Sequence, residues 1–149
     1  MANAPFPSDF QEFLSACNAA GVEYLLIGGY AVTYHGYPRY TADMDVWVRS
    51  DPANAARVVD ALDRFGFADA GATADMFLKP DQIVCLGVEP LRLELFTTIP
   101  GVEFEDCWAS RVVQEYDDLS VPIISRDDLL KNKAASGRPK DLIDVEALE

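Results

Sequence analysis

Two aspartates one residue apart, Asp43 and Asp45, lie inside an otherwise apolar run that contains Met44 and Val46-Trp47-Val48. Side chains alternate across a β-strand, so on a strand the two carboxylates share one face and the apolar residues share the other. Aspartate is depleted in strands and is costly to bury without a partner. The pattern therefore predicts a positively charged partner, for which a divalent metal ion is the simplest candidate.

A third acid lies on a second predicted strand, residues 91–96. The leucines of this strand form one face, while Arg92 and Glu94 point to the other. If the two strands are neighbours in one sheet, Asp43, Asp45 and Glu94 form an oxygen-rich cluster. Mg²⁺ and Mn²⁺ prefer carboxylate and water ligands, with substrate phosphates completing the shell. The three acids are therefore predicted metal ligands and catalytic residues.

A glycine pair, Gly28-Gly29, follows a predicted buried strand over residues 23–27 and precedes a short predicted helix over residues 30–35. Amides at a helix start can hold phosphate, and the missing Cβ atoms let a phosphate approach the main chain. The spacing matches neither the G-x-x-x-x-G-K-[ST] loop nor G-x-G-x-x-G. The glycines are predicted nucleotide-binding residues of another type of site.

Gly28-Gly29, the motif Arg39-x-Thr41-x-Asp43-x-Asp45 and the later acid Glu94 together resemble the nucleotidyltransferase superfamily typified by DNA polymerase beta. More narrowly, the chain resembles small bacterial nucleotidyltransferases, some of which are encoded in toxin/antitoxin pairs. The segments 124–133 and 137–144 are similar to the C-terminal signature of that group. The resemblance spans nearly the whole chain.

The resemblance implies an α/β (α+β) fold with a mixed β-sheet flanked by helices. One domain is expected over residues 1–149, with 125–149 as its C-terminal helical segment. It also implies two-metal chemistry that moves a nucleoside monophosphate from a nucleoside triphosphate to an acceptor hydroxyl. In the superfamily the first two acids bind metal and the third completes the site, roles that map to Asp43, Asp45 and Glu94. Many members have Gly-Ser where this chain has Gly28-Gly29, so a serine contact to phosphate is absent.

Basic residues are scarce, and five of the twelve lie within a short C-terminal stretch: Arg126, Lys131, Lys133, Arg138 and Lys140. If this segment folds over the sheet, Lys133 and Arg138 grip the triphosphate tail and offset charge that builds during transfer. The alternative is that these cations solvate the surface and offset a helix dipole. Arg39 and Thr41 are further nucleotide-binding candidates, although Arg39 could equally form a structural ion pair and Thr41 could serve only as a strand former.

Bulk properties restrict the partners. A chain of 149 residues with 50% hydrophobic content can bury a core as one domain. A net charge of −13 disfavours non-specific binding to duplex nucleic acid, because neutralising phosphates drives such binding. The expected substrates are a nucleoside triphosphate and an acceptor hydroxyl of a small molecule, a protein or an RNA end. The three cysteines lack metal-binding spacing and are expected to be core residues, and no membrane span is expected, so the predicted location is cytoplasmic.

Local signals place further elements. Ser8 with Gln11 predicts a helix start by a capping box, and Ser125 with Asp128 repeats this signal for a last helical region. Asp51-Pro52 predicts a third helix start. Residues 76–78 and 83–86 are predicted short strands around a turn.

Three function classes remain open from the sequence. The first is the metal-dependent nucleotidyltransferase. The second is a non-catalytic module with the same fold that acts as a partner in a toxin/antitoxin-like or regulatory pair. A weaker third is a phosphohydrolase that uses the same acids with water as the nucleophile. The small domain could also pair with itself as a homodimer or with a cognate protein partner to complete an acceptor site.

Overall fold

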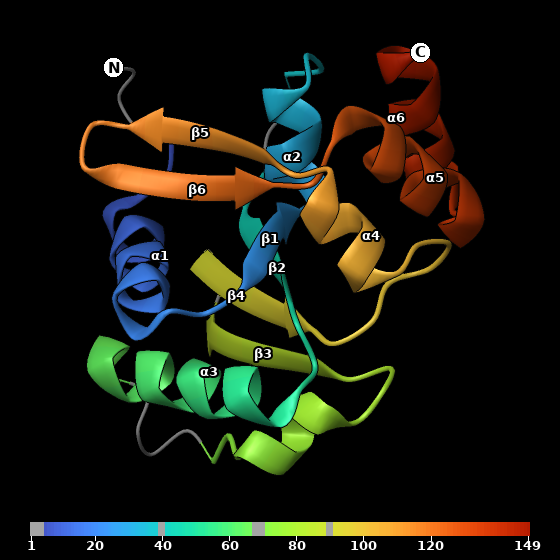
Figure 1. Ribbon diagram of the computed structural model, residues 1–149. Coiled ribbons are helices and arrows are strands. Elements are labelled where there is room, and N and C mark those ends of the chain that lie inside the picture. The colour runs from blue at the N-terminus through green and yellow to red at the C-terminus, as the bar shows by residue number, and fades with distance from the viewer. Residues whose placement is uncertain (1–4, 39–40, 67–70, 89–90) are drawn as a thin grey trace.

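The computed structural model describes residues 5–38, 41–66, 71–88 and 91–149 (Figure 1). Its helices are α1 (Ser8–Ala20), α2 (Gly28–Tyr34), α3 (Pro52–Phe65), the 3₁₀ helix η1 (Ala74–Leu78), α4 (Phe104–Ala109), α5 (Arg126–Ser136) and α6 (Pro139–Leu148). Its strands are β1 (Tyr24–Ile27), β2 (Asp43–Val48), β3 (Ile83–Val88), β4 (Leu91–Phe96), β5 (Val112–Tyr116) and β6 (Leu119–Ile123).

The six strands form one mixed sheet in the order β3-β4-β2-β1-β6-β5. The central pair β2 and β4 is parallel, as is β1 with β6, whereas β1–β2, β3–β4 and β5–β6 are antiparallel. A parallel pair needs a crossover, and the chain between β2 and β4 supplies it with α3, η1 and β3. The mixed sheet with flanking helices that the sequence predicts is confirmed.

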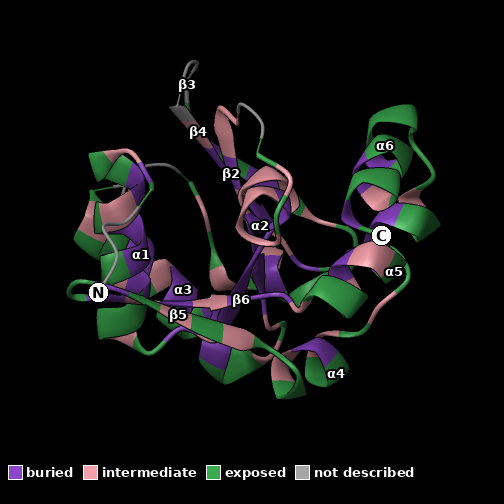
Figure 2. Ribbon diagram, turned by 90° about the horizontal axis from the view of Figure 1, so that it is seen from above, coloured by how far each residue is buried: buried purple, intermediate pink, exposed green. Residues whose placement is uncertain are grey.

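The hydrophobic core lies between the sheet and its helices, where purple ribbon concentrates in Figure 2. Helix α1 packs beside α3, and its apolar stripe (Phe10, Phe13, Leu14 and Cys17) is buried. The β2 side chains that alternate with the aspartates, Met44 and Val46, are wholly buried. This apolar face fixes β2 in the sheet and leaves the acids on the opposite face.

Helix boundaries follow local capping chemistry in two of the three predicted cases. The Asp51 carboxylate accepts a hydrogen bond from the Asn54 amide at 2.7 Å, with Pro52 as the first helical residue of α3. Ser125 caps α5 by accepting from the Asp128 amide at 3.2 Å. The capping box predicted at Ser8 is wrong, because α1 already begins at Ser8 after Pro7 and has no side-chain cap.

The strand predicted at residues 76–78 is also wrong. These residues belong to η1, whose start is capped through Thr73. Only Phe77 of the three is fully buried, while Leu78 is exposed, so one inward side chain is enough to anchor a short helical turn.

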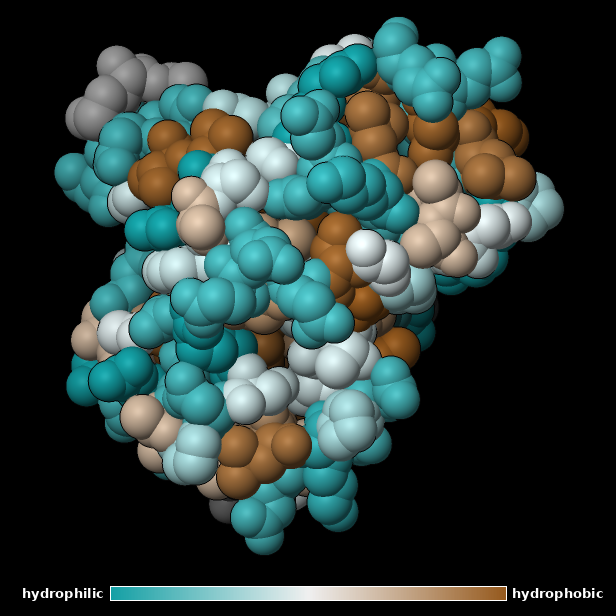
Figure 3. Space-filling model, turned by 45° about the vertical axis from the view of Figure 1, so that its right-hand side comes forward, coloured by the Kyte–Doolittle hydropathy of each residue, from teal (hydrophilic) through white to brown (hydrophobic). Residues whose placement is uncertain are grey.

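The face shown in Figure 3 is largely hydrophilic, with some hydrophobic residues gathered over the C-terminal helices. Leu142 and Ile143 of α6 are about half exposed there. Of the cysteines, Cys17 and Cys107 are buried as expected, whereas Cys85 is exposed on the edge strand β3. Among the described residues, no helix has the length and apolarity needed to cross a membrane.

Candidate active site

The three predicted acids lie together on neighbouring strands. The parallel register of β2 and β4 places Asp45 opposite Glu94 and Asp43 opposite Arg92. Because these positions alternate with the buried Met44 and Leu93, all four polar side chains emerge on the same face of the sheet. The two acid-bearing strands are therefore neighbours in one sheet, as the predicted cluster of acids requires.

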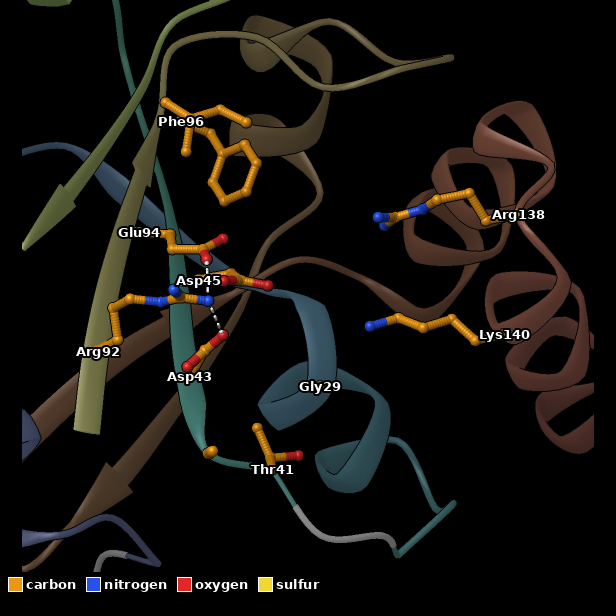
Figure 4. Close-up of a pocket in the computed structure, with 11 residues that line it drawn as sticks. Gly29, Thr41, Asp43, Asp45, Arg92, Glu94, Phe96, Arg138 and Lys140 are labelled. Carbon is orange, nitrogen blue, oxygen red and sulfur yellow. Dashed lines mark hydrogen bonds and ion pairs between the residues drawn. The ribbon is translucent and has the colours of Figure 1, made fainter. Parts of the chain in front are cut away.

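The acids open into a cavity of about 500 Å³. Its walls come from the start of α2, from the segment that precedes β2, from strands β2, β3 and β4, and from the start of α6. The lining residues are Gly29, Thr41, Ala42, Asp43, Asp45, Ile83, Arg92, Glu94, Phe96, Arg138 and Lys140. Figure 4 shows the acids on the sheet side and the two cations of α6 pointing toward them from the other side. The cavity thus combines an acidic floor with a basic wall.

Arg92 lies among the acids, and its guanidinium joins two of them. One nitrogen, Nη2, is 2.9 Å from Oδ2 of Asp43 and 3.2 Å from Oε1 of Glu94 (Figure 4). The Arg92 side chain is 37% exposed and faces the cavity. The sequence indicated the direction of this side chain but not its position between the acids.

The pKa of Asp45 is strongly raised. Burial, the nearby Glu94 carboxylate with which it is hydrogen-bonded, and Asp43 raise the pKa of Asp45 to about 7, while Lys133 opposes the shift. Two carboxylates in contact cannot both ionise at low cost. In the metal-free protein, the Asp45–Glu94 pair therefore retains a proton at mildly acidic pH.

The donor set fits a hard divalent cation by its chemistry. Oδ1 of Asp43 and Oδ1 of Asp45 are buried and have no hydrogen-bond partner among the described residues. Buried carboxylate oxygens are normally satisfied, and a cation would satisfy both. Within the described ranges, no three acidic, histidine or cysteine side chains form a ready-made metal site. The carboxylate oxygens that a cation would need are nevertheless present on Asp43 and Asp45.

The glycine pair has a packing role that the sequence did not reveal. Gly28 has a φ of +68°, and a Cβ there would collide with the Asp45 carboxylate. A Cβ on Gly29 would lie 2.6 Å from the Thr41 hydroxyl oxygen. The two glycines therefore let the α2 start lie directly against the side chains of Asp45 and Thr41.

The C-terminal cations divide into two groups. Arg138 and Lys140 at the start of α6 line the cavity, whereas Arg126 and Lys131 do not. Lys140 was part of the basic cluster in the sequence but was not predicted as a site residue, because nothing local distinguishes it from its neighbours. The structure adds it, together with Arg92 and Phe96, to the candidate site.

The Arg138 side chain is 67% exposed and its Nε lies 2.8 Å from Oδ2 of Asp141, whereas Lys133 is buried. The Lys133 side chain is 7% exposed, and its ammonium lies 2.9 Å from Oδ1 of Asp141 and 3.3 Å from Oδ2 of Asp144. It borders a second cavity of about 340 Å³ that also reaches Asp45, Gly28 and Arg138. Lys133 is thus near the site but already paired with two buried acids of α6. Its contact with a triphosphate stays a prediction.

The remaining nucleotide-binding candidates are Thr41 and Arg39. Thr41 lines the cavity beside Asp43, and its buried hydroxyl has no hydrogen-bond partner among the described residues. Arg39 lies outside the described residues. The assignment of Gly28, Gly29, Thr41, Arg138 and Arg39 to nucleotide binding stays a prediction.

The sequence matches no protein-family model and no curated protein. Solved structures do match. A protein from Thermotoga maritima described as a candidate nucleotidyltransferase aligns with 99% of this chain and 94% of its own, at 11% identity and a TM-score of 0.63. The lincosamide antibiotic adenylyltransferase LnuA, solved with lincomycin bound, aligns over 98% of each chain at 16% identity and a TM-score of 0.57.

A third match is an antigenic nucleotidyltransferase-like protein from Paracoccidioides brasiliensis. It aligns with 97% of this chain and 76% of its own, at 17% identity and a TM-score of 0.52. At identities of 11–17%, these likenesses establish architecture and not activity. The chain has the nucleotidyltransferase fold, as its resemblance to the polymerase-beta-like superfamily implies.

Proposed function

We propose that this chain is a metal-dependent nucleotidyltransferase that moves a nucleoside monophosphate from a nucleoside triphosphate to an acceptor hydroxyl. The observation that carries the proposal is the cavity in which Asp43, Asp45 and Glu94 face Arg138 and Lys140 (Figure 4). Acids that can hold Mg²⁺ or Mn²⁺, opposite cations that can hold phosphate, are what phosphoryl transfer requires.

Asp43, Asp45 and Glu94 would hold the metal ions. When bound, Mg²⁺ or Mn²⁺ would neutralise phosphate charge and stabilise the attacking and leaving oxygens. The two partnerless oxygens of Asp43 and Asp45 support this assignment. Their strand positions hold them in place, since each alternates with a fully buried residue.

Arg138 and Lys140 would hold the triphosphate tail. Arginine and lysine are the usual phosphate ligands, and here both reach from α6 toward the acids. Gly28, Gly29, Thr41, Arg39 and Lys133 are the further candidates proposed for nucleotide contact. Their support is the sequence pattern, together with the position of all but Arg39 around the two adjoining cavities.

In the proposed reaction the acceptor oxygen attacks the α-phosphorus in line. The bond from that phosphorus to the bridging oxygen breaks, pyrophosphate leaves, and the hydroxyl proton passes to a carboxylate of the site. Glu94 is the proposed recipient of this proton. The chain's own contribution is positioning and charge neutralisation rather than covalent help.

A small molecule is the acceptor class that we favour. LnuA, named as a lincosamide antibiotic adenylyltransferase, aligns with this chain over 98% of both lengths, so a fold of this size can act on a small acceptor. The net charge of −13 disfavours a nucleic-acid polymer. A protein side chain remains the second acceptor class to test.

The test is calorimetric titration of the wild type and Asp43→Asn with each nucleoside triphosphate, with and without Mg²⁺. Binding that requires both the metal and Asp43 is expected, and it would identify the base. If no triphosphate binds under any condition, the enzyme proposal fails. The non-catalytic module would then take its place, and a protein partner should be sought.

A further inference from the structure

Arg92 occupies the space between two acids that are proposed to hold metal. Its Nη2 atom lies within 3.2 Å of both the Asp43 and the Glu94 carboxylates, which come from different strands. A guanidinium shared by two carboxylates neutralises part of the repulsion that three neighbouring acids would otherwise create. The protein therefore carries its own cation in the acidic part of the cavity.

In this position Arg92 competes with a divalent cation for the same carboxylates. Arg92 contacts Oδ2 of Asp43 and Oε1 of Glu94, so a metal bound at Oδ1 of Asp43 still competes with it for the negative charge of both carboxylates. The described residues contain no ready-made three-ligand metal site even though three acids lie together. In the metal-free protein, Arg92 is a cation that pairs with two of these acids.

The contact can be exchanged. Side chains of Arg92, Asp43 and Glu94 are 37%, 30% and 20% exposed, so the ion pairs lie at the cavity surface and not in the core. Ion pairs at this exposure are worth little individually and can be broken by a competing cation. By contrast, Lys133 is 7% exposed and enclosed by its two acids, so it is not exchangeable in the same way.

We propose that Arg92 is a resident counter-ion that competes with the divalent cation for Asp43 and Glu94 and is released into the cavity when the metal binds. This inference rests on the proposed function. Released, the guanidinium lies in the same cavity as Arg138 and Lys140 but on the opposite wall (Figure 4). A phosphate between the walls is then contacted from two sides, which is ordinary chemistry for arginine. Arg92 is therefore a competitor of the metal in the metal-free protein and a phosphate ligand once the metal is bound.

The alternative is that Arg92 only braces the acids. The two roles predict opposite changes in metal affinity when the Arg92 side chain is removed. A brace holds Asp43 and Glu94 in place, so its removal weakens metal binding. A competitor occupies them, so its removal strengthens metal binding.

The experiment is titration of nucleotide-free protein with Mn²⁺ at pH 7.5, followed by the electron paramagnetic resonance signal of free Mn²⁺. Arg92→Met removes the charge and keeps most of the length, and it is expected to tighten Mn²⁺ binding roughly 3- to 10-fold. Arg92→Lys retains a cation and is expected to stay closer to the wild type. Arg64→Met, which breaks an exposed pair with Asp60, is the matched control and is expected to leave binding unchanged.

Two outcomes would overturn the inference, and they are distinguishable. If wild-type Mn²⁺ binding is lost in Asp43→Asn but Arg92→Met binds Mn²⁺ with equal or weaker affinity, only the role of Arg92 is wrong. If Mn²⁺ binding by the wild type does not depend on Asp43, the proposed function fails as well. Circular dichroism of each variant establishes that it is folded. Should Arg92→Met not fold, Arg92→Gln takes its place in the same comparison.

A second titration tests the released state. At saturating Mn²⁺, Arg92→Met is expected to bind the nucleoside triphosphate identified above about 10-fold more weakly than the wild type. A brace confined to the metal-free state would leave this affinity unchanged.

Discussion

The Asp45 carboxylate lies directly against Gly28, in the space that any side chain at position 28 would need. Asp45 comes from β2, and Gly28 is the first residue of α2. The backbone at Gly28 has a φ of +68°, a region that residues with a Cβ adopt at a cost. One glycine therefore satisfies two requirements, a left-handed backbone and a close approach by a candidate metal ligand.

Gly28→Ala is expected to destabilise the fold and to displace Asp45. The backbone alone costs about 1–2 kcal/mol, and the collision with the carboxylate adds to it. Gly137→Ala is the matched control, because Gly137 has a φ of +67° with nothing within 4 Å of its missing Cβ. Urea unfolding of the two variants separates the backbone cost from the cost of the collision with Asp45. Equal losses of unfolding free energy would show that the collision with Asp45 contributes nothing.

Gly29→Ser restores the serine that many resembling proteins have, yet it is expected to destabilise this chain. The new Cβ would meet the Thr41 side chain, with the hydroxyl oxygen at 2.6 Å and Cγ2 at 2.9 Å. Overpacking of this kind costs about 1–3 kcal/mol. In a Thr41→Ala background only a 3.3 Å contact with Cβ remains, so the penalty should shrink. A double-mutant cycle by urea unfolding measures the coupling, and additive effects would contradict the prediction.

Asp45→Asn is expected to stabilise the metal-free protein above neutral pH. The folded-state pKa of Asp45, raised to about 7 mainly by burial and then by Glu94, exceeds its unfolded value near 3.9. Ionised Asp45 therefore opposes folding, and this cost grows as pH rises from about 4 to 7. The gain from Asp45→Asn should reach roughly 2–4 kcal/mol at pH 8 and vanish near pH 4.

The measurement for Asp45 is unfolding with a metal chelator present, across this pH range. Asp60→Asn, on an exposed helix face, serves as the control and should show no such pH dependence. A loss of stability in Asp45→Asn at pH 8 would indicate that the carboxylate is a structural partner instead.

Lys133→Met is expected to destabilise the C-terminal helices by about 3–5 kcal/mol, because it leaves Asp141 and Asp144 buried without their shared ammonium. Lys131→Met, at a 69% exposed side chain, should change stability by no more than about 0.5 kcal/mol. Thermal or urea unfolding compares the two. A loss in Lys133→Met no larger than that in Lys131→Met would contradict the structural role.

The same network predicts acid sensitivity. Burial raises the pKa of Asp141, but hydrogen bonds from Ser136, Lys133 and Arg138 outweigh it and lower the pKa to about 2. A depressed folded-state pKa gives stability that is present above about pH 4 and lost as pH falls toward 2. Asp141→Asn should remove this part of the acid dependence, as measured by unfolding between pH 2 and 5.

Short-range signals in the sequence were largely sufficient for the local structure. Asp51 with Pro52, and Ser125 with the following turn, begin helices where predicted, because a cap depends on residues within one helical turn. The capping box predicted at Ser8 is wrong, because Pro7 precedes Ser8 and the helix starts one residue earlier than the capping box requires. The strand predicted at residues 76–78 is wrong, because a single buried ring, Phe77, suits a 3₁₀ turn as well as a strand.

The sequence by itself determined that Asp43 and Asp45 share a face, and that Glu94 points away from its buried leucines, since alternation is a property of any strand. Only the tertiary structure decided that β2 and β4 pair in parallel, placing Asp45 beside Glu94 and Arg92 between the acids. It also decided that Arg138 and Lys140 face the cavity while Lys133 is paired inside. Such long-range contacts depend on the packing of the whole core, which no stretch of a few residues encodes.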